Sequence, residues 1–369
     1  MSKLSVLERL ILVTALVCPT LSFSQNTSSL NPDSHLLPSP RPDRIILNLS
    51  ENPLEAIHVN WRTDTTRVIS HLEVAQATAG PEFRDKTTQL KAVTEMLVSQ
   101  QDEEPTIQAN YHQVKLTGLE PGSSYVYRVG GFGAGQWIHA SIPSMMTPGN
   151  HEFSKNPATL TPHWNAQFNL PTNGPKGLEE TTYEVNFPEL KIISLDGEQI
   201  DESPEYRKAQ MDWLRAVLTD NPRKWTVITF HYPVYATHPN RYHDKMIDYI
   251  RPILQEFKVD LAIQGHDHAY ARGRAFEENG KLDYGKGTVY VVSVGGPKMY
   301  EVKSDEWMAR KAYGTQTYQW IKVKDNILSF KTYTALGELY DSFEIHKNPQ
   351  GENTLVNNIP NTPERLQNK

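Results

Sequence analysis

Three short apolar segments in the second half of the chain constrain its fold more than any other feature. Residues 190–195, 225–230 and 261–264 each have the length and composition of one buried strand. Apolar residues at helical spacing fill much of the intervening sequence, at residues 203–218 and 246–257. Strands that alternate with helices predict an α/β sheet, in which functional loops follow the carboxyl ends of the strands.

The two helical stretches carry their own boundary signals. Ser203 supplies a capping hydroxyl and Pro204 suits the first turn, so a helix is expected to start there. Pro252 lies inside the second stretch and should kink that helix or restart it. Further strands, which would complete a layered sandwich, are expected at residues 288–294, 317–323, 327–333 and 338–345.

The first third of the chain has a different spacing of apolar residues. Ile57, Val59 and Trp61 alternate with less apolar neighbours, and a similar alternation at residues 125–129 follows the turn signal at residues 119–122. Several short strands separated by such turns predict an all-β sandwich.

The first 24 residues have the pattern of a secretory signal peptide. Two basic residues, Lys3 and Arg9, precede a short apolar core at residues 10–17. This core is far shorter than the roughly 20 residues that cross a bilayer, so cleavage is favoured over a membrane anchor. We therefore expect a secreted or periplasmic protein with no membrane span. The only cysteine, Cys18, would leave with the peptide, so neither disulfides nor thiolate ligands are expected.

Charge excludes one class of partner. The formal net charge is −6, and no stretch is basic enough for nucleic-acid binding. Residues 25–40 are polar and rich in Pro and Ser, which predicts a flexible lead-in.

The first candidate site is Gly149-Asn150-His151-Glu152. The Asn150 carbonyl oxygen can bind a divalent metal without adding charge, and Gly149 would let the backbone turn sharply toward it. His151 can protonate a leaving alkoxide or bind a phosphate oxygen, and Glu152 can orient His151. Taken alone, the tetrapeptide also fits an exposed loop with a capping Asn.

Two more candidate sites follow expected strands. His231 comes directly after residues 225–230, although a lone His there is more often structural. Gly265-His266-Asp267-His268 follows residues 261–264. Its two imidazoles would project to one side of an extended chain, or face two adjacent metals from a turn. A buried His pair without metal is the alternative.

In this order, the three segments resemble the calcineurin-like metallophosphoesterases, and within them the purple acid phosphatase-like group. That group has Gly-Asn-His-Glu, a later strand-ending His and Gly-His-x-His. Residues 42–45, 59–63 and 116–122 are also similar to its fibronectin type III-like N-terminal module. The expected fold is an N-terminal all-β sandwich at residues 41–131 and a truncated α/β metallophosphoesterase sandwich at residues 132–347. A loose polar tail is expected at residues 348–369.

The resemblance implies a secreted acid phosphatase that acts on small phosphorylated substrates. Asn150, His231 and His266 would hold one metal, His268 would belong to a second, and His151 would be the acid near the leaving group. The family uses two ions, of Fe, Zn or Mn in this setting, about 3.5–4 Å apart.

A loop is expected after His231, and it contains three further polar residues. His238, Arg241 and His243 are candidate phosphate contacts in that loop.

The chain departs from the family before Gly149. The family has Asp-x-Gly and Gly-Asp-x-x-Tyr or Gly-Asp-x-x-Asp there, but residues 131–148 contain no Asp, Glu or Tyr. This stretch is also shorter than the roughly 30 residues of a βαβ unit, so we infer an internal deletion joining near Gly130 to Gly135.

The deletion would remove the carboxylates that bridge two cations. We therefore expect at most one tightly bound metal, little phosphatase activity, and sheet edges left uncovered by missing central strands. Two alternatives remain: a non-catalytic binding protein, and a mononuclear metal hydrolase that uses Asn150, His231 and His266.

Overall fold

The computed structural model describes residues 37–99, 106–130, 142–155 and 157–366. The expected signal peptide, most of the expected lead-in and the inferred junction up to Gly135 lie outside these residues. Pro38–Lys369 is one compact unit. No helix in the described ranges is long and apolar enough to span a membrane.

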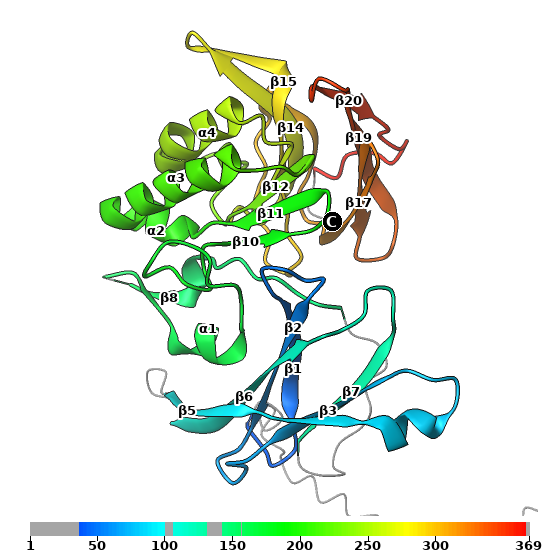
Figure 1. Cartoon of the computed structure of the whole chain (residues 1–369). Coiled ribbons are helices and arrows are strands. Elements are labelled where there is room, and N and C mark those ends of the chain that lie inside the picture. The colour runs from blue at the N-terminus through cyan, green and yellow to red at the C-terminus, as the bar shows by residue number, and fades with distance from the viewer. Residues whose placement is uncertain (1–36, 100–105, 131–141, 156, 367–369) are drawn as a thin grey trace, which may run out of the picture. The chain divides into compact units, whose positions relative to one another are not determined.

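The first part of this unit is the expected all-β sandwich (Figure 1). Its core contains Val59, Trp61, Leu72 and Val129 from both sheets, so the apolar sides of the alternating strands face inward. One antiparallel sheet has the order β1 (Asp43–Leu49), β2 (Ala56–Thr63), β6 (Ile107–Thr117) and β5 (Val93–Ser99). The other has the order β4 (Thr88–Lys91), β3 (His71–Gln76) and β7 (Tyr125–Gly130), with the 3-10 helix η2 (Pro81–Lys86) before β4.

The expected α/β sheet is present and has seven strands. β11 (Leu190–Ser194), β12 (Trp225–Thr229), β13 (Leu261–Gln264) and β15 (Lys281–Val292) are parallel neighbours, which confirms the predicted strand–helix–strand pattern. The sequence reading did not anticipate three antiparallel strands: β10 (Tyr183–Asn186), β14 (Tyr270–Glu278) and β16 (Met308–Ala312).

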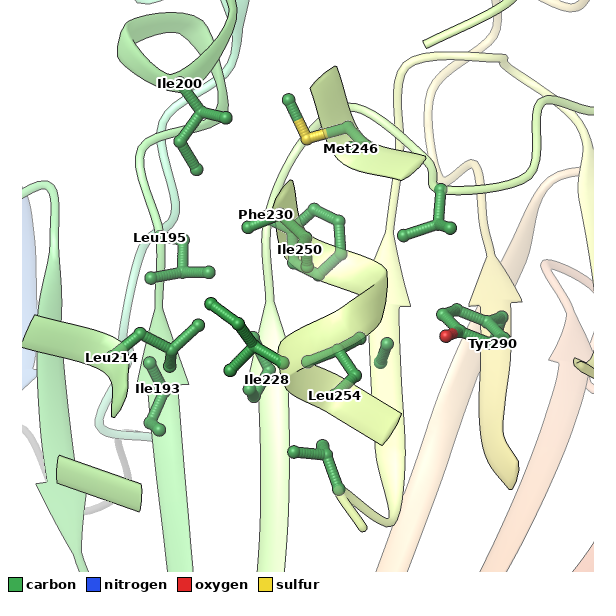
Figure 2. Packing of buried hydrophobic residues seen from close by; sticks show 14 of the residues in the cluster. Ile193, Leu195, Ile200, Leu214, Ile228, Phe230, Met246, Ile250, Leu254 and Tyr290 are labelled. Atoms are coloured by element: carbon green, nitrogen blue, oxygen red, sulfur yellow. The ribbon is translucent and has the colours of Figure 1, made fainter. Parts of the chain in front are cut away.

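Helices pack on one face of this sheet. Ser203 Oγ accepts a hydrogen bond from the Tyr206 amide at 3.2 Å, as expected for the cap of α3 (Pro204–Thr219). Near Pro252 the second helix changes from a π-helical turn, η4 (Met246–Ile250), to α4 (Arg251–Glu256), as predicted. Figure 2 shows side chains of these helices packing with Ile193, Ile228 and Tyr290. The remaining short elements are η3 (Asn150–Glu152), β8 (Phe153–Ser154), β9 (Thr159–Leu160), α1 (Pro162–Gln167) and α2 (Gly197–Glu202).

The opposite face of the sheet packs against a second, antiparallel sheet. Trp225 and Leu261 share a buried cluster with Phe330 and Phe343 of that sheet. Its order is β17 (Thr317–Lys324), β18 (Ile327–Thr334), β19 (Leu339–Lys347) and β20 (Asn353–Asn357).

The expectation of a loose tail after residue 347 is wrong, because β20 lies there. Polarity misled the prediction, since an edge strand needs few apolar side chains when its backbone pairs with β19. Beyond β20, the Arg365 amide donates to the Tyr340 hydroxyl at 3.0 Å.

The expectation that central strands of the family are missing stays a prediction. The seven-stranded sheet is continuous from β10 to β16 in the described residues, so no gap opens at its centre. An uncovered edge does exist: within the described ranges β17 pairs only with β18, and its Trp320 is 65% exposed.

Candidate metal centre

Asn150, His231 and His266 meet where the parallel strands end. His231 follows β12, His266 follows β13, and Asn150 opens η3. His231 Nε2 lies 2.9 Å from Asn150 Oδ1 and 3.0 Å from His266 Nδ1. The structure therefore brings together the three residues that the sequence assigned to one metal.

The donor atoms fit a metal better than they fit hydrogen bonds among themselves. With the amide oxygen of Asn150 toward His231, Nε2 would have to share its single proton between Asn150 and His266, or donate to Asn150 while accepting from His266. One proton cannot point directly at both partners, and a neutral imidazole nitrogen cannot donate and accept at once. One divalent ion would instead be held by all three residues, because an amide oxygen and two neutral imidazole nitrogens are a donor set that such ions accept.

Both imidazoles are held in the neutral form that binds metal. Burial lowers the pKa of His231 to about 4, with further lowering from His151 and His268. Burial also lowers the pKa of His266 to about 3, helped by His231 and Arg241. Each ring therefore keeps one nitrogen free of a proton at neutral pH, and that nitrogen can bind a metal.

Gly149 is required for space rather than for a sharp turn. Its φ of −116° and ψ of −177° are extended, which corrects the sequence-based reason. A Cβ there would lie 2.7 Å from the His231 ring. Glu152 also differs from expectation: its carboxylate accepts from the Gly149 amide at 2.8 Å, so it holds the turn that carries Asn150 rather than contacting His151.

His268 does not join the three converging residues. His266 and His268 both have positive φ, of 66° and 47°, so the segment is a turn rather than an extended strand. The His268 ring stacks on Tyr300 with centroids 4.5 Å apart. His268 Nδ1 is buried without a hydrogen-bond partner among the described residues. His151 is exposed beside Asn150.

The three candidate phosphate contacts surround the same turn. Arg241 lies with its guanidinium carbon 4.7 Å from the centre of the Tyr300 ring, and the His238 ring is 5.8 Å from that centre. The His243 ring is 5.4 Å from the His266 ring. Tyr300 was missed by the sequence reading, because no strand pattern marks it.

A second donor cluster, formed by His243, His266 and Asp267, has ligand atoms within 4.8 Å of one another. Asp267 is already neutralised by Arg241, whose Nη1 lies 2.9 Å from Oδ1. A cation there would compete with that guanidinium, so the Asn150 cluster is the better metal site.

The carboxylates of the segments that form the site are bound elsewhere. Glu152 accepts from Gly149, Glu198 from the Tyr232 hydroxyl, and Asp196 from the Gln199 amide. Burial raises the pKa of Asp196 to about 6, and its other oxygen, Oδ2, is buried without a hydrogen-bond partner among the described residues. In the described residues no hydrogen bond or ion pair joins a carboxylate to the three converging residues.

Comparisons with known proteins identify the families that the two parts of the chain match. The family profile of the purple acid phosphatase N-terminal domain matches residues 42–141, and that of the calcineurin-like phosphoesterases matches residues 119–270. Purple acid phosphatase 18 of Arabidopsis thaliana is 27% identical over 180 residues, which are 45% of this chain and 40% of that protein. Probable purple acid phosphatase 20 of the same plant is 31% identical over 150 residues, 37% and 34% of the two chains.

The chain thus matches about two fifths or less of the length of these relatives. Among solved structures, purple acid phosphatase PPD1 from yellow lupin (Lupinus luteus) seeds has a similar fold. Its TM-score is 0.64 at 14% identity, over 84% of this chain and 75% of the lupin chain. The chain therefore carries the N-terminal domain of purple acid phosphatases and a domain of the calcineurin-like phosphoesterases, a family of hydrolases.

Proposed function

We propose that this chain is a secreted phosphoester hydrolase that binds one divalent metal through Asn150, His231 and His266, and that its turnover of phosphomonoesters is slow. The observation that carries the proposal is the convergence of Asn150 Oδ1 and His266 Nδ1 on His231 Nε2. Amide oxygen and neutral imidazole suit Zn, Mn or Fe.

Each neighbouring residue has a defined part in this proposal. A bound metal supplies Lewis acidity and lowers the pKa of water. Arg241 offers its guanidinium to phosphate oxygens, and His238 and His243 approach from the same loop. His151, exposed beside Asn150, donates a proton to the leaving alkoxide.

Slow turnover follows from the missing carboxylates. A second cation would have only His268 as a nearby family-type ligand, and repulsion between two divalent ions would be uncompensated. The engagement of Glu152 and Glu198 with other partners supports this expectation.

Metal analysis of the purified chain, together with aryl phosphate hydrolysis, tests the proposal. We expect about one metal per chain in the wild type, its loss in His266→Ala, and its retention in His346→Ala. His346 is a suitable control because it lies on β19 and pairs only with Glu344. Two metals per chain with normal turnover would contradict the impairment, and no bound metal would contradict the proposed function.

A non-catalytic phosphoester-binding protein is the second candidate, and the same engaged carboxylates favour it. Inserting a family segment with both Asp motifs after Gly130 separates the two. Metal-dependent hydrolysis that rises in the insertion variant from a measurable wild-type level supports the slow hydrolase. A wild type with bound phosphate and no turnover supports the binding protein.

A further inference from the structure

Asp267, between the two histidines of the turn, has more hydrogen-bond partners than either of them. Its side chain is fully buried. Oδ2 accepts from the Thr237 amide at 2.5 Å, from the Thr237 hydroxyl at 3.1 Å and from the His238 amide at 3.3 Å. These donors lie about 30 residues earlier, in the loop after β12, so one carboxylate ties two site loops together.

The other oxygen of Asp267 fixes a cation of that loop. Arg241 Nη1 donates to Oδ1 at 2.9 Å and to the His266 carbonyl at 2.9 Å. Only one nitrogen of the guanidinium is used in these bonds, which leaves the rest of the group for an anion. The same bonds hold Arg241 against the face of Tyr300, which itself stacks on His268.

The backbone of the turn requires such support. Two non-glycine residues at positive φ, His266 and His268, are strained and persist only where the surroundings over-determine them. Asp267 lies between them, and its four side-chain hydrogen bonds supply that constraint.

We propose that Asp267 is a positioning residue that holds Arg241 and the loop from Thr237 to His243 in place to bind phosphate oxygens beside the metal. Burial alone would raise its pKa, but His243, whose Nε2 lies 3.9 Å from Oδ1, together with the hydrogen bonds from Arg241 and two backbone amides, outweighs burial and lowers it, so the group stays an anion. This inference rests on the proposed function, because it assigns the phosphate-binding half of the same site.

Asp267→Asn is the test, with Asp260→Asn as the matched control. Asp260 is equally buried, lies at the opposite end of β13, and binds the Thr226 amide, Asn353 and Lys347. Both changes replace a buried carboxylate that links two segments, so a general loss of stability affects both. The readouts are Mn²⁺ binding and, in the Mn²⁺-loaded protein, inorganic phosphate binding by calorimetry.

In Asp267→Asn we expect phosphate affinity to fall by about tenfold or more, while Asp260→Asn binds phosphate as the wild type does. Equal phosphate affinity in the two variants overturns the inference.

Arg241→Gln should lower phosphate affinity by a similar factor. The double variant should bind phosphate little more weakly than either single variant, because both changes disrupt the same placement of Arg241. Additive losses would contradict the positioning role. Arg241→Gln alone keeps the inference testable if Asp267→Asn does not fold, since wild-type phosphate affinity in Arg241→Gln overturns it.

A wild type that binds neither Mn²⁺ nor phosphate would contradict the proposed function without deciding the role of Asp267. Hydrogen exchange decides it in that case. The amides of Thr237 and His238 should lose protection in Asp267→Asn and keep it in Asp260→Asn, and unchanged protection in both variants overturns the inference.

Discussion

The backbone of Gly149 lies against the imidazole of His231, with no space for a side chain between them. An added Cβ would be 2.7 Å from two ring atoms of His231, closer than any real Cβ contact. The tetrapeptide that carries Asn150 can approach the strand-ending histidine only because this position is glycine. The position of Asn150 relative to His231 therefore depends on the absence of a Cβ at residue 149.

Gly149→Ala should weaken metal binding by about tenfold or more, because the His231 ring must move away from Asn150. Calorimetric Mn²⁺ titration measures this. Gly296→Ala is the control, since a Cβ at Gly296 meets nothing within 4 Å. Equal Mn²⁺ affinity in the two variants would show that the ring shifts without cost.

Metal affinity should be nearly independent of pH above about 5, because the pKa values of His231 and His266 lie at about 4 and 3. Protons compete with the metal only as the pH falls through that range. Affinity measured from pH 8 to pH 4 checks this. A tenfold fall per pH unit already below pH 6.5 would indicate ordinary histidines and contradict the prediction.

His112 should make the sandwich sensitive to acid. It is buried, its two ring nitrogens contact the Thr63 and Thr94 hydroxyls at 2.8 Å, and burial lowers its pKa to about 4. The unfolded chain takes up a proton near pH 6.5 and the folded chain does not. The stabilisation is therefore complete above pH 6.5 and is lost as the pH falls to 4, by roughly 3 kcal/mol.

His112→Gln removes this titration. Urea unfolding at pH 7 and pH 4.5 should show a smaller difference in the free energy of unfolding for the variant than for the wild type. Parallel pH dependence in the two proteins would mean that His112 is not the group responsible.

Asp341→Asn should destabilise the second part of the chain by about 3–5 kcal/mol. Asp341 and Arg272 are both fully buried and joined by two hydrogen bonds, of 2.8 and 2.9 Å. The variant leaves a buried guanidinium without its counter-ion. Combining Arg272→Met with Asp341→Leu removes both charges, so urea unfolding should show a smaller loss than in Asp341→Asn. A larger loss in the double variant would show that the ion pair itself stabilises the fold.

Local patterns in the sequence determined most of the secondary structure near the site. The apolar runs at β11, β12 and β13 and the hydroxyl cap at Ser203 act within a few residues, so they can be read without a fold. β20 escaped such reading because its pairing with β19, rather than its own composition, makes it a strand. The family resemblance carried by the three polar segments implied the same three residues that converge in the structure.

The tertiary structure alone decided which atoms of these residues meet. Asn150 and His231 are 81 positions apart, and their contact depends on the space at Gly149. The left-handed turn directs the His268 ring to Tyr300, and the assignment of His268 to a second metal stays a prediction. No role was assigned to Asp267 from the sequence, because its partners lie in a loop about 30 residues away. Sequence periodicity describes neighbours along one chain segment, whereas hydrogen bonds and steric fit between loops exist only after the strands have paired.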